Sequence, residues 1–194
     1  RGGGVSLLGS LQRVEQISHM ALIEPTLPFN QTWQNNQAGG NYLNPMANQA
    51  RLRRGVWDSH QQIFQAYSNR GAFTNWRKDI LWSYVTGGTR LLENGQVELK
   101  CSPEIEGQFY DSSAPQEMAY GLSTIDFPIL YVTSDNKNRW PEASSGARAL
   151  MDVAPRFSHV VVPNVGHFIP EENPEEVARL ILEFMGSYDV EKEP

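Results

Sequence analysis

The sequence predicts an α/β fold in which helices cover a parallel sheet. Three short apolar runs, at residues 17–23, 127–132 and 157–162, are too short and too rich in β-branched residues for helices. Segments with helical spacing alternate with these runs, which is typical of parallel sheets covered on both faces. A polar side chain follows each run. These side chains are Glu24, Asp135 and His167. Because ligand sites gather at the carboxyl ends of parallel strands, we expect a site there.

The chain opens on a glycine-rich turn. Residues 1–4, Arg-Gly-Gly-Gly, precede an apolar series that predicts a short helix, and the strand at 17–23 then ends in Glu24-Pro25. Three visible strands are too few for a free-standing sheet of this kind. We therefore expect the first half of the fold to lie outside this sequence.

The middle of the chain has a different composition from its two ends. Between residues 30 and 124 it is rich in Asn, Gln, Trp and Tyr and contains amphipathic segments. These segments lie near residues 46–57, 59–67 and 76–84. We interpret the region as a helical cap or lid. The predicted domains are core 1–29, helical insertion 30–124 and core 125–194.

The end of the chain carries the clearest boundary signals. Pro155 and Pro163 bound the strand at 157–162, and a helix is expected before it, at 141–153. Asn173 followed by Pro174 is typical of an N-cap and a first helical position, and an apolar series at helical spacing follows. We therefore predict a final helix that starts at residue 174.

Composition and charge exclude several classes of function. The chain has 16 Lys and Arg against 22 Asp and Glu, and its net charge of −6 argues against a nucleic-acid interface. Arg51, Arg53 and Arg54 form the one basic cluster, which we interpret as a solvated helix face, with contact to an anionic substrate group as the alternative. One cysteine, Cys101, and four histidines without ligand-like spacing predict no metal and no cofactor.

The sequence also indicates a cellular setting. No apolar run approaches the ~20 residues that a membrane span needs, and no charged-then-apolar signal segment opens the chain. A single cysteine is typical of a reducing compartment. We therefore expect an intracellular protein, cytoplasmic or peroxisomal, although the C-terminus carries no small-basic-leucine peroxisomal signal.

A histidine on a turn between a buried strand and a capped helix is the first candidate catalytic residue. Gly166 permits a sharp bend. His167 on such a loop can offer one ring nitrogen to a nucleophile while a carboxylate orients the other. The alternative is a histidine that merely precedes a helix, and a Gly-His pair by itself leaves both interpretations open.

Together these residues resemble the C-terminal part of an α/β-hydrolase, starting just after the nucleophile elbow. In that family a Gly-x-Ser-x-Gly turn carries the serine, and serine, acid and histidine follow in that order along the chain. Residues 1–3, Arg-Gly-Gly, look like the residues after the elbow serine, and no Gly-x-Ser-x-Gly occurs in the sequence. The resemblance implies a nucleophile outside this sequence and an oxyanion-hole donor at the backbone N–H of Arg1. Three explanations stay open: the chain is a fragment, the enzyme has two chains, or a chemically modified residue before Arg1 is left out of the sequence.

The resemblance leaves two residues open as the acid. In the common family pattern the acid falls nine residues after a strand proline; counted from Pro128 this is Lys137, and Asp135 lies two residues earlier. Glu24 ends the strand after the elbow helix, a placement that some members use. We favour Glu24 as the acid, with Asp135 as the alternative. Without a catalytic role, Glu24 would be a strand-end glutamate that pairs with an arginine, and Asp135 would be an ordinary turn aspartate.

Three segments are similar to a narrower fungal group of α/β-hydrolases. They are residues 22–25 (Leu-Ile-Glu-Pro), residues 97–106 at the end of the insertion, and Gly166-His167. The group contains the yeast peroxisomal lipase, hydrolases of host-selective toxin pathways and the peroxisomal acyl-CoA hydrolase of mycophenolic acid synthesis.

The resemblance implies a serine hydrolase that cleaves an ester or thioester of a bulky hydrophobic acyl group, in fungal secondary metabolism. Phe168, Trp33 and Trp82 are the candidate substrate-binding residues, while most aromatic residues of the insertion are expected to pack its helices. The implied partner is the N-terminal half of the hydrolase fold. Alternatives are an aspartate-nucleophile haloalkane dehalogenase or epoxide hydrolase, acyl transfer or ring closure by the same residues, and a noncatalytic homologue that binds a small ligand.

Overall fold

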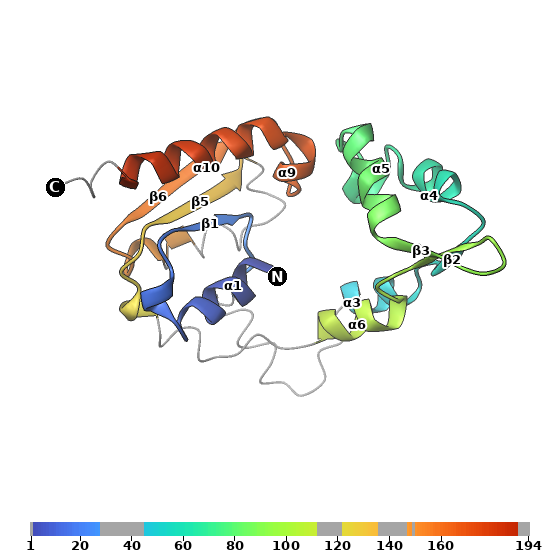
Figure 1. The fold of residues 1–194 in the computed structure, drawn as a ribbon, viewed down its shortest axis with the longest axis horizontal. Helices are drawn as coiled ribbons and strands as arrows, with labels where there is room; N and C mark the ends of the chain where they lie inside the picture. The colour runs from blue at the N-terminus through green and yellow to red at the C-terminus, as the bar shows by residue number, and fades with distance from the viewer. Residues whose placement is uncertain (1, 28–44, 112–121, 136–146, 149, 190–194) are drawn as a thin grey trace. The chain divides into compact units, whose positions relative to one another are not determined.

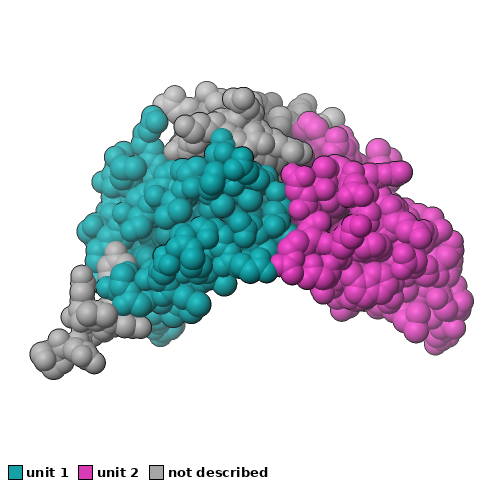
Figure 2. Space-filling view, turned by 90° about the horizontal axis from the view of Figure 1, so that it is seen from above, with its two compact units in different colours: residues 1–38, 114–194 teal, residues 39–113 magenta. Residues whose placement is uncertain are grey.

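The computed structural model describes residues 2–27, 45–111, 122–135, 147–148 and 150–189. The chain divides into two compact units, coloured separately in Figure 2. Arg1–Ala38 and Ala114–Pro194 form the core unit, and Gly39–Ser113 form the inserted unit. The domain boundaries expected after residues 29 and 124 stay a prediction.

A three-stranded parallel sheet organises the core unit, as the sequence predicted. Its strands are β1 (Met20–Ile23), β5 (Ile129–Ser134) and β6 (Phe157–Val162), in the order β1-β5-β6 (Figure 1). Met20 is paired with Ile129, and Ile129 with Phe157. The three carboxyl ends therefore lie at one edge, which is the edge expected to hold the site.

Two of these strands start later than the sequence predicted. A 3₁₀ turn, η1 (Val14–Gln16), has Ile17 as its C-cap, and β1 begins only at Met20. β5 begins at Ile129 because Pro128 has no N–H to give to a ladder, although its carbonyl oxygen accepts a hydrogen bond from the Met20 N–H at 3.0 Å. The boundaries of β6 agree with the prediction.

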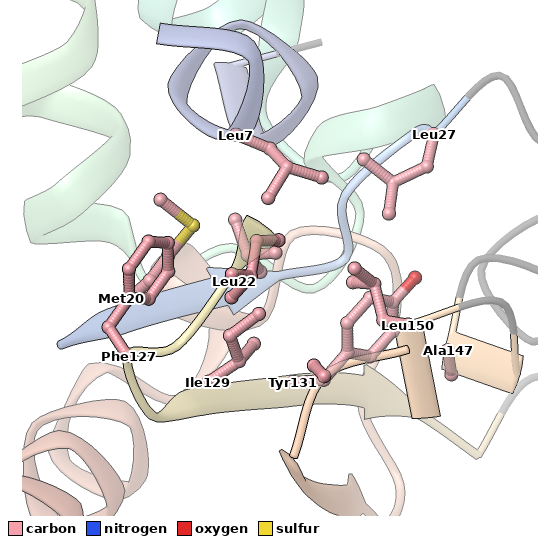
Figure 3. Packing of buried hydrophobic residues seen from close by; sticks show 11 residues of the cluster. Leu7, Met20, Leu22, Leu27, Phe127, Ile129, Tyr131, Ala147 and Leu150 are labelled. Atoms are coloured by element: carbon pink, nitrogen blue, oxygen red, sulfur yellow. The ribbon is translucent and has the colours of Figure 1, made fainter. Parts of the chain in front are cut away.

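Helix α1 (Gly2–Ser10) covers one face of the sheet (Figure 1). Leu7 of α1 is fully buried and belongs to an apolar cluster with side chains from β1 and β5 (Figure 3). Ala147 and Leu150 join the same cluster and have helical backbone, within the helix expected at 141–153. The short 3₁₀ turn η3 (Leu122–Thr124) precedes β5.

Helices α9 (Ile169–Glu172) and α10 (Pro174–Asp189) follow β6, and α10 covers the opposite face (Figure 1). A second apolar cluster lies there. Its members are Leu130, Val132, Val162, Ile169, Val177, Leu180 and Phe184. Oδ1 of Asn173 accepts a hydrogen bond from the Glu176 N–H at 3.3 Å, which confirms the predicted N-cap. The sequence did not predict α9, because a helix of four residues is too short to show a periodic pattern.

The inserted unit contains four helices and a small antiparallel sheet in its described part. The helices are α3 (Pro45–Arg51), α4 (His60–Tyr67), α5 (Lys78–Gly87) and α6 (Pro103–Asp111), with a 3₁₀ turn η2 (Gly71–Phe73). The strands are β2 (Val56–Trp57), β3 (Thr89–Leu91) and β4 (Val97–Leu99), in the order β2-β4-β3. The sequence predicted helices only, because strands of two or three residues show no alternation that could be recognised.

The arginine cluster forms ion pairs within the inserted unit. Arg51 of α3 lies 3.2 Å from Glu104 and 2.6 Å from Asp111, and both carboxylates belong to α6. Arg53 lies 2.5 Å from Glu106 of the same helix. Arg51 thus joins α3 to α6, and Arg53, which follows α3, forms a further ion pair with α6. Among the described residues, every helix is too short or too polar to cross a membrane.

Candidate active site

The structure brings Glu24 and His167 together. Glu24 directly follows β1, and His167 lies on the loop between β6 and α9. Nδ1 of the imidazole lies 3.0 Å from Oε2 of the carboxylate, although 143 positions separate the two residues in sequence. The Glu24 side chain is 3% exposed and that of His167 is 25% exposed. A buried carboxylate therefore orients a partly accessible imidazole.

The backbone of Glu24 is held in an uncommon conformation. Its φ of 45° lies in the left-handed region, which costs a residue with a side chain about 1–2 kcal/mol. The Glu24 N–H still donates to the Val132 carbonyl at 2.8 Å and so extends the β1–β5 ladder. The second carboxylate oxygen, Oε1, accepts the backbone N–H of Ser134. The end of β5 and His167 together hold Glu24 in this position.

Electrostatics keep the Glu24 carboxylate charged. Burial raises the pKa of this group, but hydrogen bonds from His167 and from Ser134 outweigh burial and leave the pKa below its ordinary value. A charged carboxylate accepts the Nδ1–H of the imidazole. In the neutral ring the lone pair is then on Nε2, the nitrogen that can take a proton from a nucleophile.

Asp135, the alternative acid, contacts the histidine loop at another point. It follows β5, and its Oδ2 accepts the backbone N–H of Asn164 at 3.2 Å. The structure thus pairs Glu24 with the imidazole and Asp135 with the backbone three residues before it. The catalytic roles of Glu24, Asp135 and His167 stay predictions.

The remaining candidate residues fall in three places. Phe168 is half-buried, and its ring meets that of His167 edge to face, 5.1 Å between centroids. Trp82 belongs to α5 of the inserted unit, where it meets the rings of Phe64 at 5.6 Å and His60 at 6.4 Å. Trp33 and Arg1 lie outside the described residues. Substrate contact by Phe168, Trp33 and Trp82 stays a prediction.

The first turn of α1 packs directly beside the acid. A Cβ added at Gly3 would lie 2.6 Å from Cβ of Pro25, the residue after Glu24, so a glycine is needed for this approach. The N-terminal turn of a helix leaves backbone N–H groups without helical partners and carries partial positive charge. The first turn of α1 therefore lies against the residue that directly follows the acid.

Two glutamates near His167, Glu171 and Glu172, were not predicted as part of the site. Glu172 accepts the Gly166 N–H at 2.8 Å through Oε2. The pKa of Glu171 is raised by burial, an effect that its own backbone N–H and His167 partly offset. The Glu171-Glu172 pair was visible in the sequence, but residues before Asn173 were assigned to a turn. No group of three or more His, Cys, Asp or Glu residues in the described part of the chain could hold a metal ion.

Solved structures with a similar fold are α/β-hydrolases. The peroxisomal alpha-beta-hydrolase Lpx1 from Saccharomyces cerevisiae matches 99% of this chain with a TM-score of 0.76 and 15% identity, and the match covers 52% of Lpx1. An esterase from M. tuberculosis matches 93% of this chain and 59% of its own, with a TM-score of 0.65 and 16% identity. E-2-(Acetamidomethylene)succinate hydrolase matches 93% of this chain and 62% of its own, with a TM-score of 0.64 and 17% identity.

The chain spans about half the length of Lpx1. No protein-family model and no curated protein matches its sequence. A peroxisomal α/β-hydrolase of yeast is among the similar structures, as the resemblance in the sequence led us to expect. The chain therefore has the α/β-hydrolase fold, with the parallel sheet in the core unit and a helix-rich unit inserted between β1 and β5.

Proposed function

We propose that this chain carries the acid and the general base of a serine hydrolase that cleaves an ester or thioester of a bulky hydrophobic acyl group. The observation that carries this proposal is the hydrogen bond between the charged, buried Glu24 carboxylate and Nδ1 of His167. That pairing is the orienting half of a nucleophile–histidine–acid triad. Esterase and hydrolase names among the structures of similar fold support the reaction class.

In the proposed mechanism the serine directly precedes Arg1. His167 takes the serine proton at Nε2 while the oxygen attacks the carbonyl carbon, and it then protonates the leaving alcohol or thiol. Glu24 fixes the tautomer and stabilises the imidazolium that forms. Water activated by the same nitrogen cleaves the acyl-enzyme. The backbone N–H of Arg1 donates to the oxyanion, a kind of contact worth about 3 kcal/mol.

The packing of α1 supports this position for the nucleophile. Gly3 lies against Pro25, so the first turn of α1 is held next to the residue that follows the acid. Among the described strands of the core sheet, β1 pairs with β5 only. We propose that the N-terminal half of the fold pairs with the other edge of β1 and supplies the second oxyanion-hole donor.

An alkyl fluorophosphonate tests the proposal on the full-length protein. This probe forms a covalent bond to an activated serine, and peptide mass spectrometry should place the label on a serine directly before the Arg-Gly-Gly sequence. His167→Ala should abolish labelling because the serine then lacks its base. A label at any other position, or undiminished labelling of the alanine variant, would contradict the proposal.

An aspartate-nucleophile dehalogenase or epoxide hydrolase is the second candidate. The pairing of Glu24, rather than Asp135, with His167 supports this candidate as much as it supports a serine hydrolase, because those enzymes can also place the acid after this strand. A noncatalytic binder is a third. The probe together with a turnover assay separates all three. A serine hydrolase is labelled, an aspartate enzyme is not labelled but turns over alkyl halides or epoxides, and a binder is neither labelled nor active.

A further inference from the structure

The loop that carries His167 is held by two carboxylates besides Glu24. Asp135 accepts the Asn164 N–H at 3.2 Å, and Glu172 accepts the Gly166 N–H at 2.8 Å. Both carboxylates accept hydrogen bonds from backbone N–H groups, one on the third residue and one on the first residue before the histidine. They therefore restrain the path of the main chain rather than one side chain.

The Glu172 contact closes a small ring. Glu172 ends α9, and its own N–H donates to the Phe168 carbonyl at 3.0 Å. Its carboxylate reaches back over residues 166–172 to the Gly166 N–H, in a half-buried position. α9 itself is fixed by Ile169, which is fully buried in the cluster with α10. Gly166 is thereby attached to a rigid part of the core.

The Glu172 carboxylate lies close to the backbone of Gly166. A Cβ added there would lie 2.5 Å from Oε1 of Glu172, so the end of the glutamate side chain would have to move. The carboxylate thus lies directly against the α-carbon next to His167. A larger residue would displace the acceptor and release the backbone on the N-terminal side of the imidazole.

The Asp135 contact fixes the start of the loop. Asn164 has a φ of 59°, a left-handed conformation that asparagine tolerates better than most residues. The Asp135 N–H donates to the Val162 carbonyl at 3.1 Å, so the aspartate is itself bound to the end of β6. This contact is exposed, and it should restrain the loop less strongly than the half-buried Glu172 contact.

We propose that Asp135 and Glu172 are positioning residues for His167. By binding the N–H groups of residues 164 and 166 they fix the loop so that Nδ1 of the imidazole meets the Glu24 carboxylate. The catalytic meaning of this restraint rests on the proposed function. The placement of the ring, in contrast, can be measured without turnover.

The test uses the ¹⁵N-labelled full-length protein, with the N-terminal half of the fold present. Ring ¹⁵N shifts report which nitrogen of His167 carries the proton, and the rings of His19, His60 and His159 serve as internal references. In Glu172→Ala we expect loss of the fixed Nδ1–H tautomer at His167 and about tenfold or faster hydrogen exchange at the Gly166 amide. Asp135→Ala should give a smaller change in the same direction.

Matched variants separate positioning from charge. Glu172→Gln and Asp135→Asn keep an acceptor atom, so both should retain most of the tautomer. Glu171→Gln removes a charge beside Glu172 without removing the Gly166 contact, and it should leave the tautomer fixed. If an alanine variant fails to fold, Gly166→Ala keeps both charges but displaces the Glu172 acceptor, and it should show the same loss.

Two outcomes overturn the proposal. The first is a fixed Nδ1–H tautomer in a folded Glu172→Ala protein whose Gly166 amide has lost its protection. The second is equal loss in Glu172→Ala and Glu171→Gln, because charge alone would then explain the effect. An unchanged Nδ1–H tautomer of His167 in Glu24→Gln would instead contradict the role of Glu24 as the acid in the proposed function. Failure of the positioning proposal and failure of the proposed function can therefore be distinguished.

Discussion

Glu24 combines three properties that are rarely found together in a glutamate at the end of a strand. Its side chain is 3% exposed, its backbone is left-handed and both of its carboxylate oxygens accept hydrogen bonds. Such strain persists only where the surroundings determine the conformation, and it concentrates at functional sites. The neighbouring strand and the histidine supply those surroundings here.

Exchanging each candidate acid for its amide should rank them. If the proposed function holds, Glu24→Gln in the full-length protein should lower kcat/KM by about 10⁴-fold, because an amide cannot stabilise the imidazolium and favours the wrong tautomer. Asp135→Asn keeps an acceptor for the Asn164 N–H and should cost about tenfold or less. Steady-state kinetics decide, and the reverse order would transfer the acid role to Asp135.

The charge of Glu24 should also appear in the pH dependence of stability. Its pKa is lower in the folded protein than in the unfolded chain, so its contribution is complete above the unfolded value of about 4.3 and is lost as pH falls through the lowered pKa. Denaturant unfolding between neutral and acid pH should show a steeper acid loss for the wild type than for Glu24→Gln. Parallel curves would contradict this expectation.

His167 should matter for chemistry far more than for folding. The side chain is 25% exposed, and His167→Ala removes one hydrogen bond to the buried Glu24 carboxylate, which should destabilise the protein by about 1–3 kcal/mol. Turnover should fall by about 10⁴-fold or more, while the melting temperature falls only by the amount that this lost contact explains. Kinetics and thermal unfolding of the same preparation check both statements, and a variant that keeps its activity would exclude His167 as the base.

At the scale of the elements, residues that restrict or cap the backbone, such as proline and asparagine, predicted the boundaries of strands and helices best. Pro155 and Pro163 fixed the limits of β6, and Asn173-Pro174 fixed the start of α10. Because parallel strands end at a common edge, the meeting of Glu24 with His167 could also be anticipated. The left-handed φ of Glu24 could not, since it arises from contacts with β5 that are distant in sequence.

Other elements were missed for a physical reason. The strands of the inserted unit have two or three residues, and α9 has four. Segments this short complete no period of apolar residues, so their conformation is set by tertiary contacts. The Glu172 contact with Gly166 belongs to this group, because nothing in a Glu-Glu pair indicates which backbone N–H it will bind.

Helix α1 offers a matched pair of glycines. Gly3→Ala places a Cβ 2.6 Å from Pro25 and should destabilise the protein by about 1–3 kcal/mol through overpacking. Gly9→Ala meets no atom within 4 Å in the same helix and should stabilise it by about 0.5–1 kcal/mol. Denaturant unfolding measures both values, and similar signs for the two variants would contradict the close packing of α1 against Pro25.

At the scale of the whole molecule, each of the two units has buried apolar residues of its own. In the core unit they line both faces of the parallel sheet. In the inserted unit they include Ile63 on α4, Leu81 and Val85 on α5, and Val97 on β4. Local stability can therefore differ between the units.

A core substitution in the inserted unit should reveal that difference. Leu81 is 2% exposed, and Leu81→Ala should destabilise its unit by about 2–5 kcal/mol. Native-state hydrogen exchange should show a larger loss of protection in α4 and α5 than in β5. Ile129→Ala, in the other unit, is the matched control and should give the opposite pattern; uniform loss in both variants would mean that the two units unfold as one.

The inserted unit leaves the chain after β1 and returns before β5, and these two strands are neighbours in the sheet. The acid follows the first of them, and the histidine loop is reached only after both. Lengthening, shortening or exchanging residues 39–113 therefore need not alter the strand register that joins carboxylate and imidazole, because loop closure depends only weakly on length. Recombination between relatives, in nature or in the laboratory, could thus exchange the inserted unit while the contact between Glu24 and His167 is inherited intact.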